Sequence, residues 1–169
     1  WFVENQQRGR SNNSVLLVRN KTVKDFFNKI KDYTREFGEP GFVWADHEDT
    51  LYNPCCEIGL YAKDEQGRSG WEFCNLCEIN VKKARTPEEF LFVCESAAVL
   101  GTIQAGYNKF PYLGPVTESI VNREALIGIS MTGMMDNPDI AFDPDLQRKG
   151  AAKILETNER IAKILGLNP

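Results

Sequence analysis

Short apolar runs alternate with longer helical patterns along this chain, and this order limits the possible folds more than any other feature. Three β-branched apolar runs are typical of buried strands, at residues 14–19, 41–46 and 125–133. Three longer stretches place apolar side chains on one helical face, at residues 22–38, 86–107 and 143–165. Strands that alternate with helices of this length predict an α/β fold with a mostly parallel or mixed sheet.

The ends of the helical stretches carry their own signals. Thr22 is predicted to cap the first helix, with Asp25 at the capping-box position and Gly38 closing it. Thr86 and Pro87 predict the start of the second helix. The inner stripe of that helix consists of small and apolar residues: Phe90, Val93, Cys94, Ala97, Ala98 and Gly101.

Composition narrows the class of protein. The 169 residues are 42% hydrophobic, which suits one domain over residues 1–169 with no internal boundary. The formal net charge is -4, and the Lys and Arg residues are scattered, which argues against a nucleic-acid or anionic-membrane partner. No apolar run reaches the roughly 18 residues that a membrane span needs, and the N-terminus lacks a secretory pattern. We therefore expect a soluble, cytoplasmic protein. Because the chain opens on Trp1 and stops after a helix-ending Gly166, we also expect it to be an internal piece of a longer polypeptide.

Five cysteines, an odd number, argue against a structural disulfide framework. Cys94 lies on the inner stripe of a predicted helix and is expected to be a core residue. Cys74 and Cys77 form a single CxxC, and His47 is the only histidine, so the zinc signal is weak. A thiol-redox or zinc-binding module built on this pair stays open as an alternative function.

The segment LYNPCCEIGLY, residues 51–61, is the strongest candidate site. In an extended segment successive side chains point to opposite sides, so the reactive side chains would lie on one side and the unreactive ones on the other. The first side would present Asn53, Cys55 and Glu57, with Cys55 as a reactive thiol, Glu57 as a base and Asn53 as a hydrogen-bonding positioner. On this reasoning Cys56 faces away and is a spectator. An ordinary turn with one buried cysteine explains the spacing equally well.

Four segments together resemble the catalytic core of ribonucleotide reductases. These are RGRSNNSV at residues 8–15, GEPGFVWADHEDTLYNPCCEIGL at 38–60, CNLCEIN at 74–80 and LIGISMTGMMDNP at 126–138. The likeness covers nearly the whole chain and is closest to the adenosylcobalamin-dependent class II ribonucleoside-triphosphate reductases, in particular their monomeric branch. It implies a fold that is part of a ten-stranded α/β barrel with a central finger loop.

The resemblance also implies roles for individual residues. Cys55 matches the finger-loop cysteine whose thiyl radical removes the 3'-hydrogen of the ribose. Glu57 matches the carboxylate that takes the 3'-hydroxyl proton, and Asn53 matches the amide that hydrogen-bonds the substrate hydroxyls. Cys74 matches one half of the redox dithiol, whereas no cysteine precedes Cys55 to serve as the other half. Cys77 is expected to pack rather than to exchange with Cys74.

Cofactor and partners follow from the same resemblance. They are adenosylcobalamin, a ribonucleoside triphosphate substrate, a deoxynucleotide effector and thioredoxin or a similar dithiol reductant, with a monomeric full-length enzyme that supplies deoxyribonucleotides for DNA synthesis. The fragment alone is expected to be inactive. The large subunit of a class I ribonucleoside-diphosphate reductase, which shares the barrel and the finger loop, is the alternative within the family.

Overall fold

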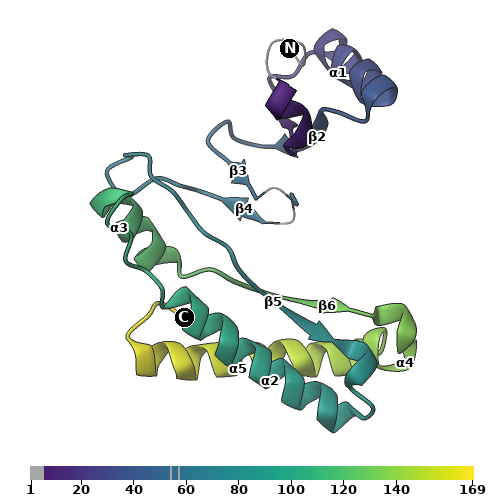
Figure 1. Ribbon diagram of the computed structural model, residues 1–169, viewed down its shortest axis with the longest axis vertical. Coiled ribbons are helices and arrows are strands. Elements are labelled where there is room, and N and C mark those ends of the chain that lie inside the picture. The colour runs from purple at the N-terminus through teal and green to yellow at the C-terminus, as the bar shows by residue number, and fades with distance from the viewer. Residues whose placement is uncertain (1–5, 54, 57) are drawn as a thin grey trace. The chain divides into compact units, whose positions relative to one another are not determined.

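A computed structural model describes residues 6–53, 55–56 and 58–169 of the chain (Figure 1). The chain divides into two compact units, unit 1 at Trp1–Tyr61 and unit 2 at Ala62–Pro169. The predicted single domain stays a prediction.

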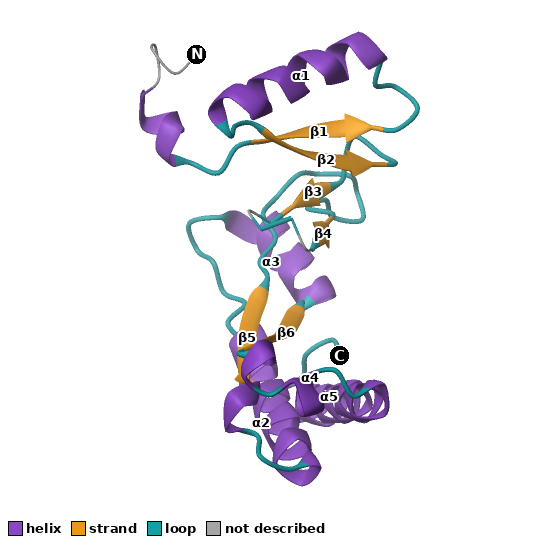
Figure 2. Cartoon of the chain, turned by 90° about the vertical axis from the view of Figure 1, so that its right-hand side faces the viewer, coloured by secondary structure: helices purple, strands orange, loops and turns teal. Residues whose placement is uncertain are grey.

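Unit 1 is built on a parallel pair of strands joined by a helix. Its elements are the 3-10 helix η1 (Gln6–Arg10), strand β1 (Ser14–Val18), helix α1 (Lys24–Phe37) and strands β2 (Gly41–Ala45), β3 (Leu51–Tyr52) and β4 (Gly59–Leu60). β1 pairs with β2 in parallel from Ser14↔Gly41 to Val18↔Ala45. Helix α1 covers one face of this pair (Figure 2), where the Phe27 ring meets Phe42 at 5.3 Å and Trp44 at 5.5 Å between centroids.

The ends of α1 confirm one prediction and correct another. Gly38 closes the helix as predicted, with φ 73° and its amide bonded to the Thr34 carbonyl oxygen. The predicted Thr22 cap is wrong, because Val23 is the N-cap residue and no side chain caps this end. The Thr22 hydroxyl instead donates to the Val18 carbonyl oxygen at 2.9 Å, so it satisfies the end of β1.

Unit 2 also contains a parallel strand pair with helices. Its elements are β5 (Asn75–Asn80), η2 (Val81–Lys83), α2 (Pro87–Ala105), α3 (Gly114–Glu124), β6 (Ile127–Thr132), η3 (Met134–Asp136), α4 (Pro138–Ala141) and α5 (Pro144–Leu165). β5 pairs with β6 in parallel from Asn75↔Ile127 to Asn80↔Thr132.

Helices α2 and α5 lie side by side in unit 2 (Figure 1). The Thr102 hydroxyl donates to the Asn158 amide oxygen at 2.9 Å, and Arg160 pairs with Glu95 at 2.8 Å. The predicted inner stripe of α2 is largely confirmed, because all its members except the half-buried Val93 are buried. Phe90 and Cys94 are each 1% exposed and belong to the main hydrophobic core.

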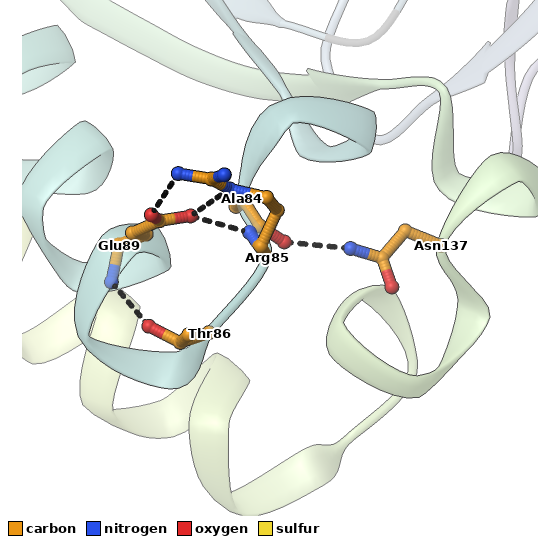
Figure 3. A network of polar contacts seen from close by, with 5 residues as sticks. All are labelled: Ala84, Arg85, Thr86, Glu89 and Asn137. Carbon is orange, nitrogen blue, oxygen red and sulfur yellow. Dashed lines mark hydrogen bonds and ion pairs between the residues drawn. The ribbon is translucent and has the colours of Figure 1, made fainter.

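The start of α2 is held by a polar network (Figure 3). The Thr86 hydroxyl accepts from the Glu89 amide at 3.2 Å, which confirms the predicted cap. Glu89 pairs with Arg85 at 2.8 Å and also accepts from the Arg85 amide at 2.7 Å. These bonds from the Arg85 side chain and amide lower the pKa of Glu89. Asn137 donates to the carbonyl oxygens of Ala84 and Val81, which ties the start of α4 to this segment.

The predicted α/β class is confirmed in its general form. Helices and small sheets are mixed in both units, and the sheets of the described residues have two strands each without closing into a barrel. Membership of a ten-stranded barrel therefore stays a prediction. Across the described residues no helix is long and apolar enough to cross a membrane.

Candidate functional site

The candidate site of unit 1 is a hairpin loop closed by Asn53. Strands β3 and β4 pair antiparallel through Leu51↔Leu60 and Tyr52↔Gly59. Next to them, the main-chain amide of Asn53 donates to the Ile58 carbonyl oxygen at 3.3 Å. The main-chain amide of Ile58 donates in return to the side-chain oxygen of Asn53 at 3.1 Å. The Cys56 amide donates to the Asn53 carbonyl oxygen at 2.9 Å. One asparagine, only 8% exposed, thus holds both ends of a four-residue loop.

The two cysteines of the loop differ in exposure and in backbone conformation. Cys55 is exposed, whereas Cys56 is half-buried and has φ 64°. The hydrogen bond from Cys56 to Asn53 makes this segment a turn and not an extended strand, so the predicted alternation of side chains does not apply to it. Pro54 and Glu57 lie outside the described residues, and the predicted role of Glu57 as a base stays a prediction.

A cavity of about 320 Å³ adjoins the loop. Its lining combines alternate residues of β1, a neighbour on β2 and the chain around β3: Asn12, Ser14, Leu16, Val43, Thr50, Leu51, Tyr52, Asn53 and Cys56. Leu16 and Val43 are partners in the strand register, so they line the cavity side by side. No lining residue among the described ones is charged. The cavity therefore offers amide, hydroxyl and thiol groups beside an apolar surface.

Sequence reasoning missed part of this lining. Asn12, Ser14 and Thr50 lie in two of the segments that resemble ribonucleotide reductases but have no predicted role there, and the prediction that Cys56 faces away is wrong. The available signal was the run of polar residues 11–14 immediately before an apolar strand, because polar groups at strand ends often belong to sites.

The second predicted thiol region lies in unit 2. Cys74 is half-buried and directly precedes β5, while Cys77 lies within that strand. The Cys77 thiol contacts the Gln104 side-chain oxygen of α2 at 4.0 Å, and a Cβ added at Gly101 of α2 would lie 3.7 Å from the Cys77 sulfur. Cys77 thus packs between the sheet and α2.

This arrangement bears on the zinc alternative. A closed structural zinc site needs four ligands, and Cys77, one of the two thiols of the CxxC, packs against α2. No group of three or more His, Cys, Asp or Glu residues able to hold a metal occurs in the part of the chain that the structure describes.

The opposite face of β5 carries a polar pair that the sequence did not reveal. Ser130 of β6 donates to the Glu78 carboxylate of β5 at 3.4 Å, as the register places these residues side by side. Both side chains are exposed, as are Asn80 and Thr132, which are paired two register positions further along. This face carries these polar side chains beside the exposed Leu76, whereas the face with Cys77 and Ile79 packs against α2.

Cys94 behaves as predicted for a core residue. It is 1% exposed, and burial raises the pKa of its thiol to about 11. A Cβ added at Gly150 of α5 would lie only 3.2 Å from the Cys94 sulfur, so this thiol is enclosed between α2 and α5. It has no role in the candidate site.

Comparisons with protein-family models, with curated proteins and with solved structures gave no match for this chain. The functional conclusion therefore depends on the sequence motifs and on the geometry of the two units.

Proposed function

We propose that this chain is part of the catalytic barrel of an enzyme that reduces ribonucleoside triphosphates to 2'-deoxyribonucleoside triphosphates by radical chemistry. The observation that carries the proposal is the Asn53-closed turn, in which Cys55 is exposed and Cys56 lines an uncharged cavity. The motif that resembles ribonucleotide reductases, Asn-Pro-Cys-x-Glu, is the sequence of this turn. The two β-α-β units, each with parallel strands, are the kind of element from which an α/β barrel is built.

In this proposal each residue has one role. A thiyl radical at Cys55 removes the 3'-hydrogen of the ribose, and Glu57 takes the proton of the 3'-hydroxyl. Asn53 holds the loop and hydrogen-bonds the substrate hydroxyls. The 2'-hydroxyl leaves as water when two electrons come from a dithiol, of which Cys74 is one half and a cysteine elsewhere in the full-length enzyme is the other. That pair becomes a disulfide, and thioredoxin or a similar dithiol reopens it by exchange.

Adenosylcobalamin supplies, when bound, the radical that withdraws the hydrogen atom of the Cys55 thiol. The exposure of Cys55 fits this requirement, because its sulfur is accessible to an external hydrogen acceptor. A thiyl radical also needs protection from stray reductants, so the proposal requires the rest of the barrel to cover the turn. A deoxynucleotide effector, a monomeric full-length enzyme and a cytoplasmic location belong to the same proposal, and five cysteines without a disulfide among them suit a reducing compartment.

The test uses the full-length product of the gene that encodes this chain. Ribonucleoside triphosphates are incubated anaerobically with a dithiol, with and without adenosylcobalamin, beside a Cys55→Ser variant. We expect turnover that requires the cobalamin and is lost in the variant. Turnover that persists in Cys55→Ser would refute the assignment of the thiyl radical. Turnover of diphosphates without cobalamin would favour the class I alternative.

The thiol-redox or zinc module is the competing function from another class. It requires Cys74 and Cys77 to act together, whereas Cys77 packs against α2. Metal analysis of the purified chain separates the two functions. Zinc in a stoichiometric amount would contradict the role of Cys74 as a redox thiol.

A further inference from the structure

Ser14 lies in the wall that two cavities of unit 1 share. The cavity of about 320 Å³ beside the loop and a second cavity of about 440 Å³ both have Asn12 and Ser14 in their linings. The rest of the second lining consists of Asn13, Val15 and Pro40. Both linings are uncharged over the residues that the structure describes. A neutral ligand in the first cavity therefore has the Ser14 side chain at the side where the second cavity begins.

The position of the Ser14 hydroxyl is set by a glycine on the neighbouring strand. Ser14 is paired with Gly41 in the register of β1 and β2, and the Gly41 amide donates to the Asn13 carbonyl oxygen at 2.8 Å. A Cβ added at Gly41 would lie only 2.9 Å from the Ser14 Oγ. The hydroxyl therefore lies across the Cα of Gly41, in space that a larger residue would need. Glycine within a strand often marks such a close approach.

The same hydroxyl is available to a ligand. Ser14 is exposed, and within the described part of the chain its hydroxyl makes no hydrogen bond. The Tyr52 hydroxyl of the same lining, in contrast, donates to the Trp44 carbonyl oxygen at 3.3 Å. Leu16 follows Ser14 on the same face of β1, at a spacing of roughly 7 Å. The wall of the cavity thus places one unpaired hydrogen-bonding group beside an apolar surface.

We propose that the Ser14 hydroxyl binds the neutral nucleoside portion of the substrate, and that Gly41 keeps the hydroxyl in the position for this bond. The inference depends on the proposed function, which supplies the ribonucleoside triphosphate and assigns its hydroxyls to Asn53. Because Asn53 lines the same cavity as Ser14, a nucleoside bound by Asn53 has the β1 wall within its reach. The triphosphate is expected outside this cavity, since an uncharged lining does not offset its charge. A hydroxyl both donates and accepts, so it can serve all four bases without choosing among them.

Steady-state kinetics of the full-length enzyme with adenosylcobalamin test this role. KM and kcat are measured for each of the four ribonucleoside triphosphates in the wild type and in Ser14→Ala. We expect KM to rise about three- to tenfold for all four substrates at nearly unchanged kcat, as for the loss of one hydrogen bond made equally in ground and transition state. Ser11→Ala is the matched control, because Ser11 is an exposed serine outside both linings. It should leave KM and kcat unchanged.

Gly41→Ala separates the hydroxyl from a general effect on the strands. In the otherwise wild-type enzyme the added methyl group displaces the Ser14 hydroxyl, so KM should rise as it does in Ser14→Ala. In the double variant no hydroxyl is left to displace, and the nearest side-chain atom is the Cβ at position 14, at an ordinary 3.9 Å. The double variant should therefore have the KM of Ser14→Ala. A further rise in KM would overturn the role given to Gly41.

Binding to the resting enzyme needs no turnover. The affinities of the full-length enzyme for free adenosine and for inorganic tripolyphosphate are measured by calorimetry. We expect Ser14→Ala to weaken the binding of adenosine several-fold and to leave that of tripolyphosphate unchanged. Weaker binding of tripolyphosphate, or an unchanged KM together with an unchanged affinity for adenosine, would overturn the inference and leave the proposed function intact. Absence of cobalamin-dependent turnover in the wild type would refute the proposed function, whereas a loss of adenosine affinity in Ser14→Ala would still support the nucleoside contact.

Discussion

The main-chain amide of Cys56 donates a hydrogen bond to the carbonyl oxygen of Asn53 at 2.9 Å. The side-chain oxygen of the same asparagine accepts from the Ile58 amide at 3.1 Å. Asn53 therefore fixes the position of the cysteine pair from both its main chain and its side chain. The candidate site depends on this one buried residue more than on apolar packing, since the loop contributes little to a core.

The side-chain bond of Asn53 can be removed by itself. Asn53→Ala leaves the Ile58 amide without its acceptor, which costs about 1–2 kcal/mol locally. We expect hydrogen exchange of the Ile58 amide to become about tenfold faster, as measured by NMR on the 169-residue chain. Asn53→Asp keeps an acceptor oxygen and should keep most of the protection. Equal protection of Ile58 in the alanine variant and the wild type would contradict this account.

Thiol reactivity should separate the buried cysteine from the exposed one. Burial raises the pKa of Cys94 from 9.0 to about 11, so at pH about 8 its thiolate fraction is roughly 100-fold below that of an unperturbed thiol. We expect iodoacetamide to modify Cys55 first and Cys94 only after unfolding, as followed by peptide mass spectrometry. The denatured chain, in which both react, is the control. Modification of Cys94 in the folded protein at the rate of Cys55 would show that α2 and α5 do not enclose it.

The sequence predicted several of the regular elements, because their signals are local, but it did not predict helix α3. The apolar runs at β1, β2 and β6 and the stripe of α2 specify strands and a helix without reference to distant residues. The caps at Thr86 and Gly38 were predictable for the same reason. The cap predicted at Thr22 is wrong because the helix begins one residue later, with Val23 at the N-cap, and the Thr22 hydroxyl donates to the carbonyl oxygen at the end of β1.

The candidate site was harder to predict, because it depends on backbone conformation. Alternation of side chains in the loop assumed an extended chain, whereas the bond from Cys56 to Asn53 bends it and places Cys56 in the cavity lining. The contribution of Ser14 and Leu16 could not be foreseen either, since it depends on which face of the β1–β2 pair α1 covers. Such choices follow from tertiary packing and not from the local sequence.

The Arg85–Glu89 pair should make the free energy of unfolding depend on pH. The side chain and amide of Arg85 lower the pKa of Glu89 in the folded protein, so the unfolded chain binds a proton there more readily. The resulting stability is present above the pKa of Glu89 in the unfolded chain, near 4.5, and is lost as the pH falls through the lowered folded value. We expect the difference in unfolding midpoint between wild type and Glu89→Gln to shrink between pH about 5 and about 3.

Arg85→Ala tests the cause of that shift. It removes the main partner of Glu89, so the variant should show a weaker dependence on acid over the same range. Thermal unfolding followed by circular dichroism at both pH values measures this. If Glu89→Gln loses as much stability on acidification as the wild type does, the pair has no part in the acid response.

The contact between α2 and α5 should not tolerate a larger residue at Gly150. A Cβ at this position would lie 2.9 Å from Phe90 Cε1 and 3.2 Å from the Cys94 sulfur, and Phe90 is 1% exposed and unable to swing into solvent. We expect Gly150→Ala to lower the free energy of unfolding by about 1–2 kcal/mol, because overpacking outweighs the gain of about 1 kcal/mol in helix propensity. Urea denaturation measures the change. Phe90→Leu makes room for the added methyl group. The loss of unfolding free energy in the double variant should therefore be smaller than the sum of the losses in the two single variants. A Gly150→Ala chain more stable than the wild type would show that propensity, and not the contact with Phe90, dominates at this crossing.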